Sequence, residues 1–278
     1  RLVEFQTGSG VHGLFLFGSS GEGPALTDDQ RLQALKTVIR VAGGKTAILV
    51  GISDNSTLRA IERASQAAEF GADGLVVTPP FYHMNSQAEV ADHFRAVREY
   101  TDMPIYAYDV PVLVKTKITA DTVVKLAAEK VIAGIKDSSG DMSGFRQVIL
   151  RTRNIEGFTV FTGMELLVDV AMLMGADGAV AGLANVAPRE YVELYDLCLA
   201  HEWLQAAELQ ERLVRLFDIA YVGAPDGSFS AGALSGFKAG LVCRGVLDCC
   251  TMAAPMRNLT SEGVAKVREL MKDLEFIN

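Results

Sequence analysis

Short apolar runs alternate with longer amphipathic stretches along most of the 278 residues of this chain. The runs are almost continuously apolar, which is typical of parallel strands that are covered by helices on both faces. Helix start signals such as Thr27 and Ser86 open the stretches between them. The pattern predicts repeated βα units and therefore an α/β protein. Seven strands are expected, at residues 11–17, 46–51, 74–78, 104–108, 131–136, 158–163 and 177–182.

Seven such repeats fit either a closed eight-stranded barrel or an open doubly wound sheet. An open sheet would usually show a G-x-G-x-x-G turn after an early strand, but the turn at residues 18–23 has a different spacing. We therefore expect a (β/α)₈ TIM barrel. Residues 1–6 resemble the end of a helix that leads into the strand at Val11. Closure needs eight strands, so the first strand is expected to be missing from this sequence.

The chain after residue 182 is predicted to be helical, at residues 188–201, 204–222, 232–246 and 261–274. We expect residues 1–222 to form the barrel body without its first strand. Residues 223–278 are expected to form the last barrel helix and a C-terminal helical extension. No boundary interrupts the repeat, so both parts are predicted to belong to one structural unit.

The charge of the chain argues against some partners. There are 26 Lys and Arg against 34 Asp and Glu, a formal net charge of −8. A nucleic-acid or anionic-membrane surface is not expected from this balance. No apolar run approaches the roughly 18 residues of a membrane helix, and the N-terminus does not have the order of a signal peptide. The sequence therefore indicates a cytoplasmic protein with a small-molecule partner.

The cysteines and histidines show no metal-binding pattern. None of the cysteines forms a C-x-x-C pair, and they fall in segments that look helical, so free thiols are expected. The histidines are scattered and match no H-E-x-x-H motif, so no metal site is predicted. The residues concerned are Cys198, Cys243, Cys249, Cys250, His12, His83, His93 and His201.

Lys136 ends an aliphatic strand, and the functional face of a parallel barrel lies at the C-terminal ends of its strands. A lysine at such a position is often only a solvated side chain at the rim. Alternatively, an ammonium held against apolar barrel walls gives up its proton more easily, and the free amine can then attack a carbonyl carbon. Lys136 is therefore a candidate for Schiff-base chemistry.

Two further strand ends carry polar groups. Tyr108 ends the strand at 104–108 and is either a packing residue or a phenol that relays protons to a nearby amine. The turn that contains Ser19 and Ser20 follows the strand at 11–17. It is either an ordinary Gly-Ser turn or a cradle for a carboxylate or phosphate, because two hydroxyls and exposed backbone N–H groups lie together there. Together, the three signals indicate an amine nucleophile, a proton relay and an anion site.

With these motifs the chain resembles the family of dihydrodipicolinate synthase and N-acetylneuraminate lyase. These are pyruvate-type class I aldolases on a (β/α)₈ barrel. The motifs occur in the family's order and span nearly the whole chain, and a C-terminal helical extension follows them. They are Gly18-Ser19-Ser20-Gly21-Glu22, Thr78-Pro79-Pro80-Phe81-Tyr82, Tyr108-Asp109-Val110-Pro111, Gly134-Ile135-Lys136-Asp137 and Gly175-Ala176-Asp177-Gly178.

The resemblance implies a role for each matching residue. Lys136 would form the Schiff base with pyruvate or another 2-keto acid, and Tyr108 would shuttle protons. Ser19 and Ser20 would hold the substrate carboxylate. Tyr82 looks like the aromatic residue that reaches into a neighbouring subunit's site in family tetramers, although Phe81 competes for this position. No cofactor or metal is implied, since the imine itself is the electron sink. A homo-oligomer, either a tetramer or a dimer, is expected from the family.

The second substrate is less closely defined. Dihydrodipicolinate synthases of the family carry an arginine shortly after the Tyr-x-x-Pro motif, whereas this chain has Leu113, with Lys115 and Lys117 nearby as possible point charges. We therefore expect cleavage or condensation of a 2-keto-3-deoxy sugar acid, or of a similar 2-keto acid, through a lysine-bound enamine. The residues expected to contact substrate after later strands are Gly163, Glu165 and Val180, with Ser138 and Ser139 as further candidates for holding hydroxyls.

Alternatives remain for both the reaction and the site. Glu165 can equally be a carboxylate at a helix N-terminus. Met164 and Leu166 flank it, so a large sialic acid is not expected. Dihydrodipicolinate synthase activity with aspartate semialdehyde is the main alternative. A 2-keto-3-deoxy sugar acid dehydratase and a barrel that binds a keto acid without catalysis are the others.

Overall fold

The computed structural model describes residues 1–223 and 227–278, and it contains all seven predicted strands. All are parallel, and they pair in chain order from β1 to β7. The fourth and fifth strands each continue one residue beyond the predicted end. The strands are β1 (Gly13–Leu16), β2 (Ala47–Gly51), β3 (Gly74–Val77), β4 (Ile105–Asp109), β5 (Gly134–Asp137), β6 (Thr159–Thr162) and β7 (Gly178–Ala179).

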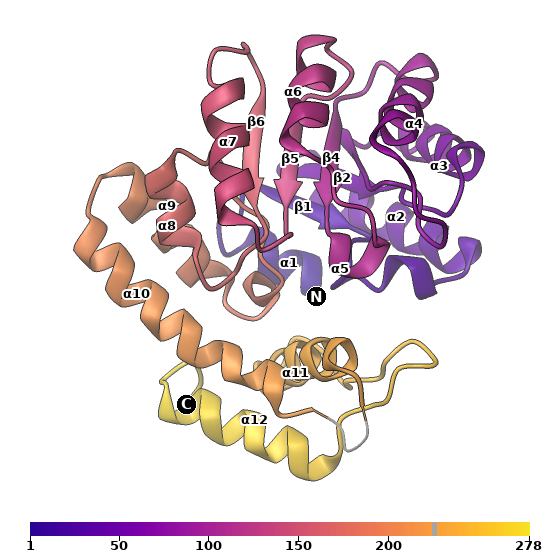
Figure 1. Ribbon diagram of the computed structural model, residues 1–278. Helices are drawn as coiled ribbons and strands as arrows, with labels where there is room; N and C mark the ends of the chain where they lie inside the picture. The colour runs from indigo at the N-terminus through magenta and orange to yellow at the C-terminus, as the bar shows by residue number, and fades with distance from the viewer. Residues whose placement is uncertain (224–226) are drawn as a thin grey trace. The chain divides into compact units, whose positions relative to one another are not determined.

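Helices connect successive strands, as a parallel sheet requires. Figure 1 shows them alternating with the strands. Within the described residues, β1 and β7 are the two edges of the sheet, and no eighth strand pairs with either. The helices of this region are α2 (Asp28–Ala42), α3 (Thr57–Glu69), α4 (Gln87–Glu99), α5 (Pro111–Val114), α6 (Ala120–Ala128), α7 (Met142–Thr152) and α8 (Val168–Met174).

The predicted start signals cap these helices. Thr27 and Gln30 form a capping box at α2, and Ser86 and Glu89 form another at α4. The buried face of α2 includes a charged residue. Leu32 is only half-buried, whereas Arg31 is buried. A guanidinium can replace an apolar side chain there because its donors find backbone acceptors, as described below.

The chain divides into two compact units. The unit with the sheet comprises residues 13–164 and 170–180, and the other comprises residues 1–12, 165–169 and 181–278. The second unit contains the predicted C-terminal helices, and the predicted boundary near residue 222 stays a prediction. Its elements are α1 (Leu2–Thr7), η2 (Leu183–Asn185), α9 (Pro188–Leu199), α10 (Trp203–Leu216), η3 (Phe217–Tyr221), α11 (Phe229–Cys243) and α12 (Ser261–Asp273).

The cysteines are free thiols, as predicted. Cys198 and Cys243 lie in helices, but Cys249 and Cys250 lie after the end of α11 and not in a helix, contrary to the expectation. The helix ends at Cys243, and Gly245 follows it with a φ of 71°, a left-handed conformation that commonly ends helices. The apolar residues beyond Gly245 are therefore in a loop. Among the helices described, none is both long and apolar enough to cross a membrane.

Candidate active site

The structure brings Lys136 and Tyr108 together on neighbouring strands. They are direct register partners in β5 and β4, and their side chains therefore leave the same face of the sheet. The Lys136 Nζ atom lies 4.4 Å from the centre of the Tyr108 ring and 5.0 Å from the centre of the Phe15 ring. Phe15 and Tyr108 meet edge to face at 5.9 Å. The amine thus lies beside two aromatic rings, which attract a cation electrostatically.

Tyr108 is 5% exposed, and its phenol has polar partners on two sides. Its hydroxyl lies 3.2 Å from Ser19 Oγ. Burial alone would raise the pKa of Tyr108. However, the charge of Lys136 and hydrogen bonds with Ser19, Ser138 and Lys136 outweigh burial, so that the pKa of the phenol is lower than its ordinary value. A phenol with a lowered pKa exchanges protons more readily near neutral pH, as a relay requires.

The predicted anion cradle lies at the end of β1. Ser19 and Ser20 are half-buried in a turn in which the Glu22 N–H donates to the Ser19 carbonyl and the Gly23 N–H donates to the Gly18 carbonyl. Phe17 opens the turn with φ 60°, a left-handed conformation that is costly for a side chain of this kind. Of the two serines, Ser19 is the one that contacts the phenol.

Gly163 lies at the end of β6, beside the amine. A Cβ atom on Gly163 would overlap Ser138 Oγ and would lie 2.9 Å from Lys136 Cε. Only glycine leaves room for both neighbouring side chains. Val180 follows β7 and donates its N–H to the Thr162 carbonyl at 2.8 Å. Both residues are at the C-terminal ends of strands, where substrate contacts are expected.

The structure separates the two aromatic candidates of the loop after β3. Phe81 is partly buried and packs against the cluster that contains Tyr108. Tyr82 is 76% exposed, with φ 89°, and its ring meets His83 at 5.0 Å. Within one chain, Phe81 and not Tyr82 is therefore the aromatic residue that packs on the Tyr108 cluster.

Glu165 belongs to the other compact unit, where its atoms already have partners. Its Oε2 atom accepts a hydrogen bond from the N–H of Leu183 at 2.7 Å, at the start of η2. Its backbone carbonyl accepts from Tyr191 and Gln210. Burial raises the pKa of Tyr191 well above its ordinary value, and the nearby Glu165 charge adds to the effect. The Leu183 contact is consistent with the second interpretation of Glu165, a carboxylate at a helix start, and both interpretations stay predictions.

A charged network on the opposite face of β4 and β5 was not predicted. Lys117 pairs with the fully buried Asp109 and donates to Ser139 Oγ at 3.0 Å, and it lies 3.9 Å from Asp137. Burial raises the pKa of Asp109, although Lys117 and the Ile118 N–H both act in the opposite direction. The network ties the loop after β4 to the loop after β5. Lys117 is thereby engaged, whereas Lys115 is exposed.

Phe15 and Arg31 are the other residues that the sequence analysis missed. Side chains alternate between the two faces of a strand, so Phe15 and Gly13 lie on the same face of β1. This face points toward Lys136, and the alternation was the sequence signal for Phe15. Arg31 lies four residues before the buried Leu35, on the same face of α2. The sequence signal for Arg31 was its charge at a helix position that the apolar pattern of α2 assigns to the buried face.

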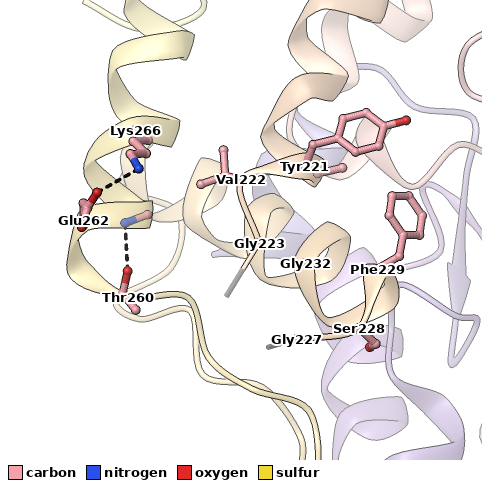
Figure 2. A pocket seen from close by; sticks show the side chains of 12 residues that line it. Tyr221, Val222, Gly223, Gly227, Ser228, Phe229, Gly232, Thr260, Glu262 and Lys266 are labelled. Carbon is pink, nitrogen blue, oxygen red and sulfur yellow. Dashed lines mark hydrogen bonds and ion pairs between the residues drawn. The ribbon is translucent and has the colours of Figure 1, made fainter. Parts of the chain in front are cut away.

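Two other features do not add to this site. No group of three His, Cys, Asp or Glu side chains in the described part of the chain is placed to hold a metal ion. A pocket of about 430 Å³ lies in the second unit, between the start of α11 and the start of α12. Figure 2 shows its lining, with Tyr221 and Phe229 near one another and an ion pair between Lys266 and Glu262. It contains none of the predicted catalytic residues.

Comparison with known proteins gives the family. The chain matches the dihydrodipicolinate synthetase family over residues 1–274. It is 35% identical over 217 residues to a 4-hydroxy-tetrahydrodipicolinate synthase of Exiguobacterium sp., a match that covers 78% of this chain and 73% of that protein.

Two solved structures have a similar fold. Dihydrodipicolinate synthase from Thermotoga maritima is 25% identical with a TM-score of 0.91, and the match covers 100% of this chain and 92% of that one. YagE, a prophage protein of the dihydrodipicolinic acid synthase family from E. coli K12 in complex with pyruvate, is also 25% identical, with a TM-score of 0.92 and coverage of 99% and 91%.

The seven described parallel strands and their alternating helices thus match the predicted (β/α)₈ TIM-barrel fold, and the predicted C-terminal helices are present. The family match, on a fold with a lysine beside a buried phenol at its strand ends, places the protein in the class of barrel lyases. Within that class, the chain belongs to the dihydrodipicolinate synthetase family, the pyruvate-dependent class I aldolases that its motifs resemble.

Proposed function

We propose that the protein joins or cleaves a carbon–carbon bond of a 2-keto acid through a Schiff base on Lys136. The expected substrate is a 2-keto-3-deoxy sugar acid, or a similar 2-keto acid, which is cleaved to pyruvate and an aldehyde or formed from them. The observation that carries this proposal is the position of the Lys136 amine, 4.4 Å from the ring of the buried Tyr108.

The proposed reaction uses the amine of Lys136 as nucleophile and the phenol of Tyr108 as acid and base. The amine of Lys136 attacks the keto carbon, and the phenol of Tyr108 protonates the oxygen, which leaves as water to give the imine. Cleavage moves the electron pair of the bond between C3 and C4 into the imine, and the C4 hydroxyl loses its proton as the aldehyde departs. The resulting enamine takes a proton at C3, and water then releases pyruvate from Lys136. Tyr108 is proposed to carry these protons, and the contact of its hydroxyl with Ser19 supports this role.

The carboxylate of the keto acid is proposed to lie in the turn with Ser19 and Ser20. Two hydroxyls and the backbone N–H groups of a tight turn form an anion cradle of the kind that proteins use for carboxylates. Ser19 links the cradle to the phenol, so that binding the carboxylate places the keto carbon near Lys136. Gly163 and Val180 are proposed to contact the rest of the substrate, and Glu165 stays a weaker candidate because one carboxylate oxygen is engaged.

Tyr82 is proposed to act from a neighbouring copy in a homotetramer or homodimer. Its exposure of 76% leaves it free to enter another subunit's site. We propose further that the protein works in the cytoplasm, without a cofactor, on 2-keto acids available there.

Dihydrodipicolinate synthase activity is the second candidate, and a specific observation favours it. The related proteins of Exiguobacterium sp. and Desulfotalea psychrophila are both named 4-hydroxy-tetrahydrodipicolinate synthase. Against it, Leu113 occupies the segment in which an arginine is expected, and Lys117 is paired with Asp109. The exposed Lys115 is the remaining point charge on this loop.

Borohydride reduction tests the Schiff base directly. The protein is incubated with pyruvate and sodium borohydride, digested, and analysed by mass spectrometry. The expected result is a reduced pyruvate adduct on Lys136 alone. Lys136→Arg keeps the charge, but its guanidinium forms no imine, so this variant should give neither adduct nor turnover. An unmodified Lys136 in the wild-type protein would exclude the aldolase.

A panel of aldehydes then separates the reactions. Pyruvate is supplied with glyceraldehyde, with other hydroxyaldehydes and with aspartate semialdehyde, and the products are separated and identified. Turnover with hydroxyaldehydes supports the sugar-acid reaction, and turnover with aspartate semialdehyde alone would establish the synthase instead. Loss of water from a 2-keto-3-deoxy sugar acid would indicate a dehydratase. An adduct on Lys136 with no turnover of any substrate would indicate a barrel that only binds a keto acid.

A further inference from the structure

Arg31 is a buried cation that is bound by carbonyl groups rather than by carboxylates. It is 7% exposed. Its guanidinium donates to the carbonyl oxygen of Gly23 at 3.1 Å and to that of Gly51 at 2.6 Å. Within residues 1–223 and 227–278 it forms no ion pair closer than 4 Å. A buried charge without a counterion is costly, which raises the question of its use.

The carboxylates near Arg31 are paired with other arginines. Asp54 lies 2.7 Å from Arg63 and 3.0 Å from Arg59, and Asp28 lies 3.7 Å from Arg63. Burial, together with repulsion from Arg63, lowers the pKa of Arg31 to about 10, although Asp28 and Asp54 act in the opposite direction. Arg31 is therefore still charged at neutral pH, while the neighbouring Asp28 and Asp54 are paired with Arg59 and Arg63.

The contacts of Arg31 lie on both sides of the Ser19–Ser20 turn. Its guanidinium stacks 4.2 Å from the centre of the Phe17 ring, where the turn begins, and its first hydrogen bond is to Gly23, where the turn ends. Its second hydrogen bond is to Gly51, the last residue of the neighbouring strand β2. One planar, forked side chain thus holds both ends of the turn and the adjacent strand end.

The turn needs such support because it is strained and crowded. Phe17 has φ 60° and Glu22 has φ 51°, conformations that cost free energy for residues with a Cβ atom. The backbone of Gly23 and of Gly51 passes close to the Phe17 carbonyl, with no room for a side chain. A Cβ atom on Gly23 would overlap this carbonyl, and one on Gly51 would lie 2.9 Å from its oxygen. A conformation of this kind persists only when surrounding contacts fix it.

We propose that Arg31 is a positioning residue for substrate binding, which holds the Ser19–Ser20 turn in its anion-binding shape and supplies a buried positive charge beside it. Arg31 does not touch the substrate in this scheme. It acts through the turn, and its charge favours the occupation of the turn by the carboxylate of a 2-keto acid. This inference rests on the proposed Schiff-base function and adds the residue that prepares its carboxylate site.

The test compares Arg31→Lys, which keeps the charge and loses the planar fork, with Arg31→Met, which loses both. Each variant is titrated with pyruvate in the presence of borohydride, and adduct formation on Lys136 is followed by mass spectrometry. Methyl pyruvate, which has the carbonyl but no carboxylate charge, is titrated in parallel. Arg59→Lys is the matched control, because Arg59 belongs to the same cluster but is half exposed and paired with Asp54.

For both Arg31 variants, the pyruvate concentration for half-maximal trapping is expected to rise about tenfold or more, which corresponds to roughly 1.4 kcal/mol. The trapping rate at saturating pyruvate and the titration with methyl pyruvate should change much less. Circular dichroism establishes that the variants are folded, and Arg31→Lys carries the test if Arg31→Met does not fold.

The inference is wrong if the folded Arg31→Lys variant traps pyruvate with the same concentration dependence as the wild-type protein. It is also wrong if the response to methyl pyruvate is weakened as much as the response to pyruvate, because this would indicate general damage. A wild-type protein that forms no adduct at all would instead remove the proposed function. The two failures are therefore distinguishable.

Discussion

Lys136 and Tyr108 are register partners on adjacent parallel strands, and the amine of the lysine lies 4.4 Å from the centre of the tyrosine ring. Each of the two side chains therefore affects the protonation chemistry of the other. The lysine charge favours the phenolate, and the phenol is within hydrogen-bond reach of the amine. Three predictions concern this pair and its surroundings, and a fourth concerns the buried His93.

Replacing Tyr108 by Phe removes the phenol hydroxyl and leaves the ring that packs beside Lys136. The fold should be retained, since Tyr108 is 5% exposed and Phe has nearly the same shape. Loss of one general acid–base group is expected to lower kcat about 100-fold to 1,000-fold. Steady-state kinetics measure the change. Tyr106→Phe is the matched control on the same face of β4, and an equal loss in that variant would contradict the role of Tyr108.

The charge of Lys136 should be visible in the titration of Tyr108. Since this charge lowers the pKa of the phenol, Lys136→Met should raise that pKa and move formation of the phenolate to higher pH. Ultraviolet absorbance measures the titration, with the Tyr108→Phe variant as the baseline. Lys115→Met removes an exposed lysine from the same end of the sheet and should leave the titration in place. An unchanged titration in Lys136→Met would show that the two groups do not interact.

Gly163→Ala should displace the Lys136 side chain without unfolding the chain. The added methyl group would overlap Ser138 Oγ and approach Lys136 Cε to 2.9 Å, so that one of these side chains must move. We expect a loss of at least about tenfold in kcat. The double variant Ser138→Ala/Gly163→Ala removes the overlapping oxygen and should recover part of the activity. If Gly163→Ala alone retains full activity, the close approach is not needed.

His93 should make the protein less stable in acid. Burial lowers its pKa to about 4, against a hydrogen bond with the backbone of Thr78, whereas an unfolded histidine titrates near about 6.5. Between these values the unfolded chain binds the additional proton, so the free energy of unfolding decreases as the pH falls from about 6.5 to about 4, by up to roughly 3 kcal/mol. The contribution is constant above and below that window.

Chemical denaturation across this pH range measures the effect of His93. The variant His93→Gln should lose less stability in acid than the wild-type protein, because Gln has no proton to bind. His83→Gln, at an exposed histidine, is the control and should follow the wild-type curve. Identical pH dependence in the wild-type protein and His93→Gln would contradict the assignment.

The sequence by itself determined the elements and the main chemical groups. Continuous apolar runs can be satisfied only by strands that are buried on both faces, so all seven strands were predicted, with Lys136 at the end of one. Capping residues such as Thr27 and Ser86 act through local hydrogen bonds, which depend on neighbours in the sequence and are therefore readable from it. The family followed from motifs at these strand ends.

Only the tertiary structure decided which side chains meet. The register of β4 and β5 places Tyr108 beside Lys136, and a shift of one residue would have turned one of them to the other face of the sheet. Folding also engages Lys117 with Asp109 and turns Arg31 toward the carbonyl groups of Gly23 and Gly51. Such contacts depend on burial and on distances between different elements of the fold. Local sequence patterns do not encode these distances, which are set when the strands and helices pack.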